Sequence, residues 1–245
     1  MIGKTLYMST FVLVHGAYHG AWCWSRLMLM LEASGHKVIA VDLPGHGDNV
    51  HPVAEVTLGA YTAAVCQIVA TADEPVILVG HSMAGAIVAG VAEVMPDRIR
   101  RLVFLTAYIP VNGTTIPDLV RADTQYSIPV ERVDEGGVPC LRLVPSVAHR
   151  HFYHDADDDD WAWVQPKLAD QALAPFVGSL TITDGGFGRV SHAYIFCRYD
   201  RAISLSLQRR MAIAADCEPT HYLKSGHSPF VSQPGILTQV LLTLT

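Results

Sequence analysis

The chain has 245 residues, half of them hydrophobic and 16% charged, which is enough apolar material to bury a large core without disulfides or metal ions. This composition excludes a disordered polypeptide. Its 17 basic residues are outnumbered by 23 acidic ones, and because phosphate backbones are bound by clustered Lys and Arg side chains, nucleic acid is not an expected partner.

Through the first hundred residues, short β-branched segments alternate with longer helical patterns, as in βαβ units around a parallel sheet. The sequence predicts, in chain order, a strand at Thr10–Val14, a helix at Trp24–Ser34, a strand at Lys37–Val41, a helix over 58–69, a strand at Val76–Val79, a helix at Ala86–Val94 and a strand at Leu102–Leu105. Gly35 stands where a left-handed residue commonly ends a helix, and Thr57 can cap the start of the next one.

After Tyr108 this alternation stops, because residues 110–190 are richer in Pro and polar residues and carry an acidic run. It resumes with a strand at Ala193–Cys197, a strand at His221–Leu223 and a helix at Gly235–Leu244. We therefore expect an α/β fold whose core is formed by residues 1–109 and 191–245. Residues 110–190 are expected to be an insertion that lies over the sheet.

The sharpest local signal follows the strand at Val76–Val79, where the chain reads Gly80-His81-Ser82-Met83-Ala84. A serine flanked by small residues between a buried strand and a helix is typical of a nucleophile elbow, a tight turn that holds the hydroxyl clear of the backbone. Ala84 replaces the second glycine of the strict G-x-S-x-G pattern. The sequence predicts Ser82 as a nucleophile, and an ordinary strand–helix turn is the alternative.

A serine is a poor nucleophile unless a base takes its proton, and that base must be oriented by an acid. In this type of fold the chain order is serine, acid, histidine. Asp200 follows one late strand and His227 follows the last, so both belong to carboxyl ends of strands, where ligands bind in open α/β sheets. Taken singly, residues of these types are more often surface side chains. In this chain order and at these positions, we predict Asp200 and His227 as acid and base.

The loop after the first strand, His15-Gly16-Ala17, is the expected source of one oxyanion donor. The backbone N–H groups of Ala17 and Met83 form the natural pair, and Gly16 lets the backbone approach closely. His15 is interpreted as a residue that hydrogen-bonds its own loop, not as a catalytic group.

With these residues identified, the sequence resembles the α/β-hydrolase superfamily, within it the small esterase and hydroxynitrile lyase group, which includes plant methyl-ester esterases and bacterial pyrethroid-hydrolase-type carboxylesterases. The resemblance runs nearly end to end and depends on five segments: Phe11–Trp24, Asp42–Gly47, Gly80–Gly85, Tyr199–Ile203 and Gly226–His227. It implies an α/β-hydrolase fold with a mostly parallel central sheet. It also implies that residues 110–190 form a helical cap shaping the substrate pocket, and that the five residues above have the roles just given.

Two positions separate the lyase and esterase members of this group. The lyases have a threonine after the histidine of the first loop and a lysine after the catalytic histidine, to handle the cyanohydrin hydroxyl and the departing cyanide. This chain has Gly16 and Ser228 there. Ester hydrolysis is therefore the favoured reaction.

Several features of the inserted segment have simpler interpretations. His149, His151 and His154 match no zinc spacing, so we predict a histidine cluster without metal. The acidic run 155–160 lacks the pattern of an EF-hand loop and reads as the solvated start of a helix. Aromatic residues follow in this segment and either line the pocket or serve only in packing: Trp161, Trp163 and Phe176.

The five cysteines are odd in number and show no C-x-x-C spacing, which indicates a reducing, cytoplasmic setting. The N-terminus lacks the apolar core of a signal peptide, and Met8 is a candidate start that would make residues 1–7 an extension. Uncharged stretches are interrupted by turn-like clusters, so no membrane span and no membrane partner are expected. A homodimer is compatible with the sequence.

The preferred hypothesis is a cofactor-free serine carboxylesterase acting on a small or medium hydrophobic ester. The first alternative keeps the fold but changes the reaction to that of a hydroxynitrile lyase or another tailoring enzyme. The second is a ligand receptor with a vestigial hydrolase site.

Overall fold

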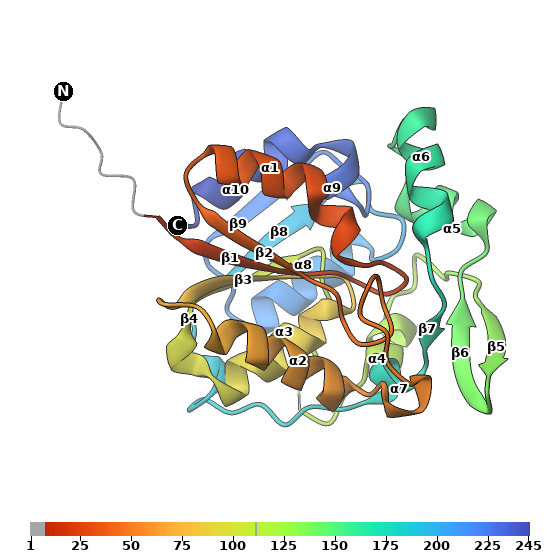
Figure 1. The fold of residues 1–245 in the computed structure, drawn as a ribbon, viewed down its shortest axis with the longest axis horizontal. Coiled ribbons are helices and arrows are strands. Elements are labelled where there is room, and N and C mark those ends of the chain that lie inside the picture. Colours follow the sequence, from red (N-terminus) through yellow and green to blue (C-terminus); the bar gives the residue numbers. More distant parts are fainter. Residues whose placement is uncertain (1–7, 111) are drawn as a thin grey trace.

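The protein is described from a computed structural model that covers residues 8–110 and 112–245. The expectation that residues 1–7 are an upstream extension concerns residues outside this description. Six parallel strands form the central sheet in the order β2-β1-β3-β4-β8-β9 (Figure 1). Their bounds are β1 Thr10–Val14, β2 Lys37–Val41, β3 Val76–His81, β4 Ile99–Leu105, β8 His192–Cys197 and β9 Thr220–Leu223.

Helices cover both faces of this sheet, which explains why its central strands are continuous apolar runs. The helices α1 (Ser25–Ala33), α9 (Pro229–Ser232) and α10 (Pro234–Leu242) contact one another on one face, and α2 (Leu58–Ala70) and α3 (Ala84–Val94) on the other (Figure 1). Another helix, α8 (Leu205–Ala214), packs on β8. Within the described ranges, no helix combines the length and apolar character needed to cross a bilayer.

The local signals that delimit the first helices are confirmed. Gly35 has a φ of +86°, and the Thr57 hydroxyl oxygen accepts the Ala60 N–H at 3.0 Å. The main shift of boundaries is at the predicted elbow, where the strand β3 continues to His81 and the helix α3 already begins at Ala84. The turn is therefore tighter than the six-residue loop expected from the sequence.

The segment between β4 and β8 lies beyond the carboxyl ends of the parallel strands (Figure 1). It carries the helices α4 (Ile116–Ala122), α5 (Pro145–Phe152), α6 (Asp158–Val164) and α7 (Ala174–Val177), and the strands β5 (Glu131–Glu135), β6 (Val138–Arg142) and β7 (Gln171–Ala172). These strands form an antiparallel sheet in the order β5-β6-β7. The segment thus differs from the helical one expected. Gly136 and Gly137, with φ of +61° and +90°, form the tight turn that joins β5 to β6, and such a Gly-Gly pair is itself a hairpin signal.

Candidate active site

Ser82 occupies the turn between β3 and α3 with a φ of +54°, a conformation that non-glycine residues seldom adopt. Its carbonyl oxygen accepts the Tyr108 N–H at 3.0 Å, which fixes the turn against the end of β4. A Cβ at Gly80 would lie 2.7 Å from a methyl of Val88, so only glycine fits at this approach. The strained, well-supported turn is what an exposed nucleophile requires.

Asp200 and His227 come together although 26 residues separate them in the chain. The His227 Nδ1–H donates to Asp200 Oδ2 at 2.7 Å, and both residues are almost entirely buried. The other carboxylate oxygen, Oδ1, accepts the backbone N–H groups of Ala202 at 2.6 Å and Ile203 at 3.0 Å. Because a carboxylate accepts and His227 Nδ1 must therefore carry a proton, Nε2 is left free to accept one.

Thr106 completes the surroundings of the acid and was not identified from the sequence. It directly follows β4, has a φ of +37°, and its hydroxyl donates to Asp200 Oδ2. The acid therefore accepts from four donors, so its orientation is fully determined. The signal available in the sequence was a polar residue at the carboxyl end of a buried strand, the same signal that pointed to Asp200 and His227.

The expected oxyanion donors lie at the same carboxyl end of the parallel strands as Ser82, because Ala17 follows β1 and Met83 follows β3. Ala17 lines the same cavity as Ser82, and Met83 is the first residue before α3. In the described part of the chain, the N–H groups of Ala17 and Met83 have no protein acceptor. A Cβ at Gly16 would lie 2.9 Å from Ser82 Cβ, which shows how closely the first loop approaches the elbow.

Neutral histidines support this arrangement. His15 bonds the Gly16 carbonyl at 2.8 Å through Nδ1 and accepts the Leu43 N–H through Nε2, as predicted for a loop residue. His81 Nε2–H donates to the His227 carbonyl at 2.9 Å. Burial is the main cause that lowers the pKa of His81 well below its usual range and that of His19 to about 3. Both rings are therefore uncharged at neutral pH and act through hydrogen bonds and packing.

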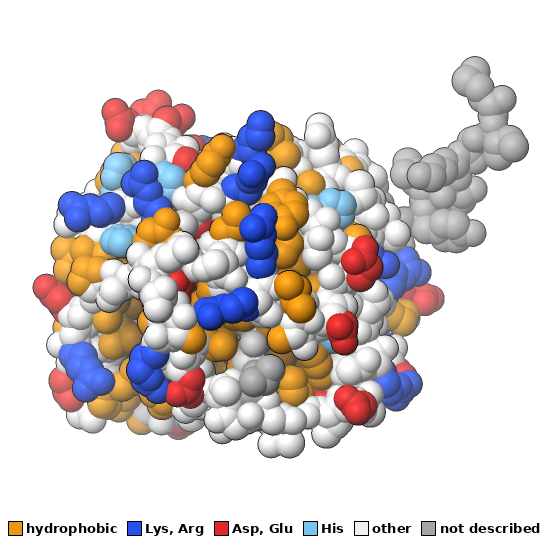
Figure 2. All heavy atoms as spheres, turned by 180° about the vertical axis from the view of Figure 1, so that it is seen from behind, with side chains coloured by type: hydrophobic (Ala, Val, Ile, Leu, Met, Phe, Trp, Pro, Cys, Tyr) orange, Lys and Arg blue, Asp and Glu red, His pale blue; other side chains and the backbone are white. Residues whose placement is uncertain are grey.

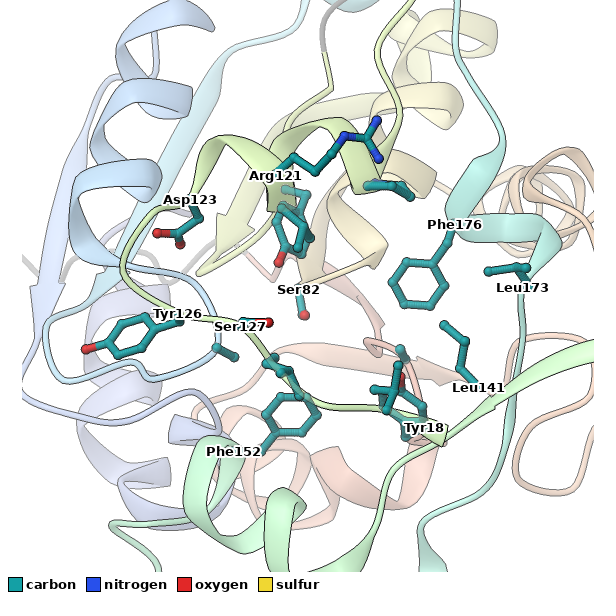
Figure 3. Close-up of a pocket in the computed structure, with 17 residues that line it drawn as sticks. Tyr18, Ser82, Arg121, Asp123, Tyr126, Ser127, Leu141, Phe152, Leu173 and Phe176 are labelled. Atoms are coloured by element: carbon teal, nitrogen blue, oxygen red, sulfur yellow. The ribbon is translucent and has the colours of Figure 1, made fainter. Parts of the chain in front are cut away.

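A cavity of about 320 Å³ opens above Ser82, whose side chain points into it (Figure 3). Phe152 and Phe176 lie on two sides of Ser82 in Figure 3, and both come from the inserted segment. Most other lining residues are apolar, among them Val120, Ile128 and Leu141. A largely apolar space of this size fits a small uncharged molecule.

Other residues singled out in the inserted segment have contacts away from the cavity. Trp161 packs edge-to-face against His149 and at a tilt against Tyr153, and Trp163 packs edge-to-face against Trp22. Of the three predicted aromatic residues, only Phe176 lines the space. Asp157 caps α6 as expected, through the Asp160 N–H at 2.7 Å. Within residues 8–110 and 112–245, no three His, Cys, Asp or Glu side chains are arranged to hold a metal ion.

Asp155 and Asp160 contradict the interpretation of the acidic run as fully solvated. Asp160 is 7% exposed and pairs with Arg26 of α1, while Asp155 accepts hydrogen bonds from residues on either side of His227. Both carboxylates bind the core because the chain folds back across it between α5 and α6. Sequence alone shows only five aspartates within six positions at this point.

Comparison with known proteins identifies relatives along nearly the whole chain. The alpha/beta hydrolase family matches residues 11–239. Methylesterase 9 of Arabidopsis thaliana is 29% identical over 97% of this chain and 98% of its own length, and norfluorocurarine synthase 2 of a Strychnos species is 32% identical over 96% and 94%. This chain spans 63% of the length of putative methylesterase 11, chloroplastic, of Arabidopsis thaliana, at 30% identity over 96% of this chain.

Solved structures agree with these relatives. Polyneuridine aldehyde esterase superposes with a TM-score of 0.88 at 25% identity, over 97% of this chain and 99% of its own. A methylesterase from Arabidopsis gives 0.85 at 26% over 97% and 98%, and a pyrethroid hydrolase gives 0.82 at 26% over 97% of each chain. Similarity to methylesterases and other esterases supports an esterase function. The match over residues 11–239, together with the six-stranded parallel sheet flanked by helices, shows that this chain belongs to the alpha/beta hydrolase family.

Proposed function

We propose that this protein is a serine carboxylesterase that hydrolyses a small or medium-sized hydrophobic ester through an acyl-enzyme, without a cofactor. The observation that carries the proposal is the buried Asp200–His227 pair, with 2.7 Å between Oδ2 and Nδ1. Asp200 and His227 follow β8 and β9, and Ser82 follows β3 of the same parallel sheet. Ser82 lines an apolar cavity. We infer that residues 110–190 act as a cap, because they supply most of that cavity's lining.

In the proposed reaction, His227 Nε2 accepts the Ser82 proton as Oγ attacks the ester carbonyl carbon. The carbonyl oxygen becomes an oxyanion that receives hydrogen bonds from the N–H groups of Ala17 and Met83. Cleavage of the bond to the alcohol oxygen leaves acyl-Ser82, and the alcohol departs with the proton held by His227. A water molecule, deprotonated by His227, then attacks the acyl carbon, releasing the acid and restoring Ser82.

The surroundings of Gly16 favour hydrolysis over cyanohydrin cleavage. A Cβ added there would lie 2.9 Å from both His81 Nδ1 and Ser82 Cβ, so a threonine side chain has no room without movement of the elbow. Ser228, where the lyases of this group have a lysine, is 1% exposed. An ammonium group at that depth would need a partner to offset its desolvation.

The proposal is tested by rapid mixing with p-nitrophenyl esters of different acyl lengths. We expect a burst of one p-nitrophenol per chain, followed by steady turnover, because the activated p-nitrophenyl ester acylates Ser82 faster than water hydrolyses the acyl-enzyme. Mandelonitrile is assayed in parallel for cyanide release. One equivalent of p-nitrophenol without further turnover would support a receptor with a vestigial site, and cyanide release without ester turnover would support a lyase; either result contradicts the proposal.

Phe176 is expected to set the length of the substrate that fits. The Phe176→Ala substitution removes a ring from one side of the cavity, so short esters lose a contact while longer ones fill the new space. We expect kcat/KM for p-nitrophenyl acetate to fall about tenfold and that for the octanoate to change less than about threefold. Val177→Ala is the matched control, since Val177 is 51% exposed and does not line the cavity. Equal losses on both esters would contradict this role.

A further inference from the structure

Five residues of the inserted segment, 151–155, run from the last two residues of α5 into the loop before α6 and are here called the clasp. Histidine side chains gather on the face of the molecule shown in Figure 2, near the acidic tip of the inserted segment. Two clasp histidines bond the loop that carries Asp200. His151 Nδ1–H donates to the Arg201 carbonyl at 2.9 Å, and His154 Nε2–H donates to the Tyr199 carbonyl at 2.8 Å. The clasp therefore holds the carbonyl groups of the residues before and after Asp200.

Asp155, the last clasp residue, brackets His227 in the same way. Its Oδ2 accepts the Gly226 N–H at 2.6 Å and the Ser232 hydroxyl at 3.0 Å, so it joins the residue before His227 to the helix α9 after it. A Cβ at Gly226 would lie 2.5 Å from Asp155 Oδ1, so glycine is required for this approach. Bonds from a backbone N–H to a carboxylate are charge-assisted and stronger than neutral ones, which makes this a firm attachment.

Tyr153 extends the clasp to the loop of the expected oxyanion donor. Its hydroxyl bonds His19 Nε2, and His19 Nδ1 bonds the Ala17 carbonyl at 2.6 Å. Because a carbonyl only accepts, Nδ1 carries the proton, and the Tyr153 hydroxyl must donate to Nε2. Burial raises the pKa of Tyr153, which keeps this hydroxyl protonated. Ala17 is thus connected to the same five residues that hold the loops of Asp200 and His227.

We propose that the clasp is a positioning element that sets the relative placement of acid, base and oxyanion donor, and that the inserted segment therefore supports catalysis as well as enclosing the substrate. This inference rests on the proposed esterase function. The loops involved lie beyond the ends of β8 and β9, where a backbone bond from the Tyr199 N–H to the Ser225 carbonyl at 3.0 Å joins them, and the clasp adds side-chain bonds to Tyr199, Arg201 and Gly226. Phe152, itself a clasp residue, lines the cavity and packs on the His227 ring at 4.9 Å between centroids. Substrate in the cavity thus touches the element that holds the base.

The experiment compares Asp155→Ala, Asp155→Asn and the control His149→Ala. Asparagine keeps an oxygen that can accept from Gly226 and Ser232, whereas alanine removes it. His149 lies in α5 beside the clasp and packs edge-to-face against Trp161, away from the catalytic loops. We expect Asp155→Ala to lower kcat about 10- to 100-fold with KM within about threefold, because a displacement of about 1 Å at reacting groups has effects of this size. Asp155→Asn should recover at least about a third of the wild-type kcat, and the control should retain it.

A second readout reports the geometry itself. The proton between His227 and Asp200 is expected to give a downfield proton NMR signal, which should shift or broaden in Asp155→Ala and remain in His149→Ala. A folded Asp155→Ala enzyme with wild-type kcat and an unchanged signal would overturn the clasp. Should that variant fail to fold, Tyr153→Phe decides, with a kcat about tenfold lower expected and an unchanged kcat contrary to the proposal. Failure of the esterase function is distinct, because the wild-type enzyme would then show no steady turnover of p-nitrophenyl esters.

Discussion

The Ser82→Ala enzyme is expected to hydrolyse p-nitrophenyl esters with a kcat lower by on the order of 10³-fold or more, while remaining folded. The substitution removes the oxygen proposed to form the acyl-enzyme, so the burst of p-nitrophenol should disappear as well. Alanine adopts the left-handed backbone of the turn no less readily than serine, and the bonds from Tyr108 and Gly85 to the Ser82 carbonyl do not involve the side chain. The free energy of unfolding should therefore change little.

The activity that remains in Ser82→Ala distinguishes the contribution of the serine hydroxyl from that of the surrounding cavity and backbone N–H groups. The N–H groups of Ala17 and Met83 and the cavity remain in Ser82→Ala, so slow hydrolysis above the uncatalysed rate is expected from oxyanion stabilisation and binding alone. Labelling by a fluorophosphonate should reach one per chain in the wild type and vanish in the variant. Ser146→Ala, an exposed serine of α5, is the control and should label fully. Near-native turnover by Ser82→Ala would refute the serine mechanism.

Residues in the core could be predicted because each has a local signal. Ser82 and Asp200 each follow a buried strand, and His227 follows the edge strand β9. Because the carboxyl ends of parallel strands meet at one edge of a sheet, positions far apart in the sequence are expected to lie close together there. Thr106 had the same signal and was overlooked. The hairpin at Gly136-Gly137 also had one, masked by the exposed charged residues of β5.

The sequence holds no local signal for the contacts that the clasp makes. Tyr153 meets His19 across 134 positions of the chain, and Asp155 meets Gly226 across 71. These pairs depend on how the inserted segment folds back over the core, which no periodicity or turn chemistry specifies. Asp155 also stands at the head of an acidic run, where its neighbours Asp157 and Asp158 face solvent and only tertiary packing distinguishes it. The predicted roles are thus strongest where one sheet orders the chain and weakest where two segments meet.

Asp200→Asn is expected to lower kcat on the order of 10⁴-fold, through the tautomer of His227 rather than through loss of structure. The two backbone N–H groups of Ala202 and Ile203 require an acceptor, so the asparagine oxygen should take the place of Oδ1. Its NH₂ group then faces His227 Nδ1, which must become the acceptor, and the ring proton moves to Nε2. A protonated Nε2 cannot accept the proton of Ser82, and the base is lost although every heavy atom can stay in place.

The same substitution at Asp216 gives the matched control, because Asp216 is exposed and has a φ of +46° that asparagine adopts readily. Asp216→Asn should keep the wild-type kcat.

Thr106→Val probes the remaining donor to Asp200 Oδ2. It should lower kcat far less than Asp200→Asn does, because the carboxylate keeps three of its four hydrogen bonds and His227 keeps its tautomer. Steady-state kinetics together with the downfield proton signal distinguish these cases, since Asp200→Asn should lose both activity and signal. An Asp200→Asn enzyme within about tenfold of wild type would show that His227 is oriented by another group, and the clasp, which holds the loops of both residues, would be the next place to look.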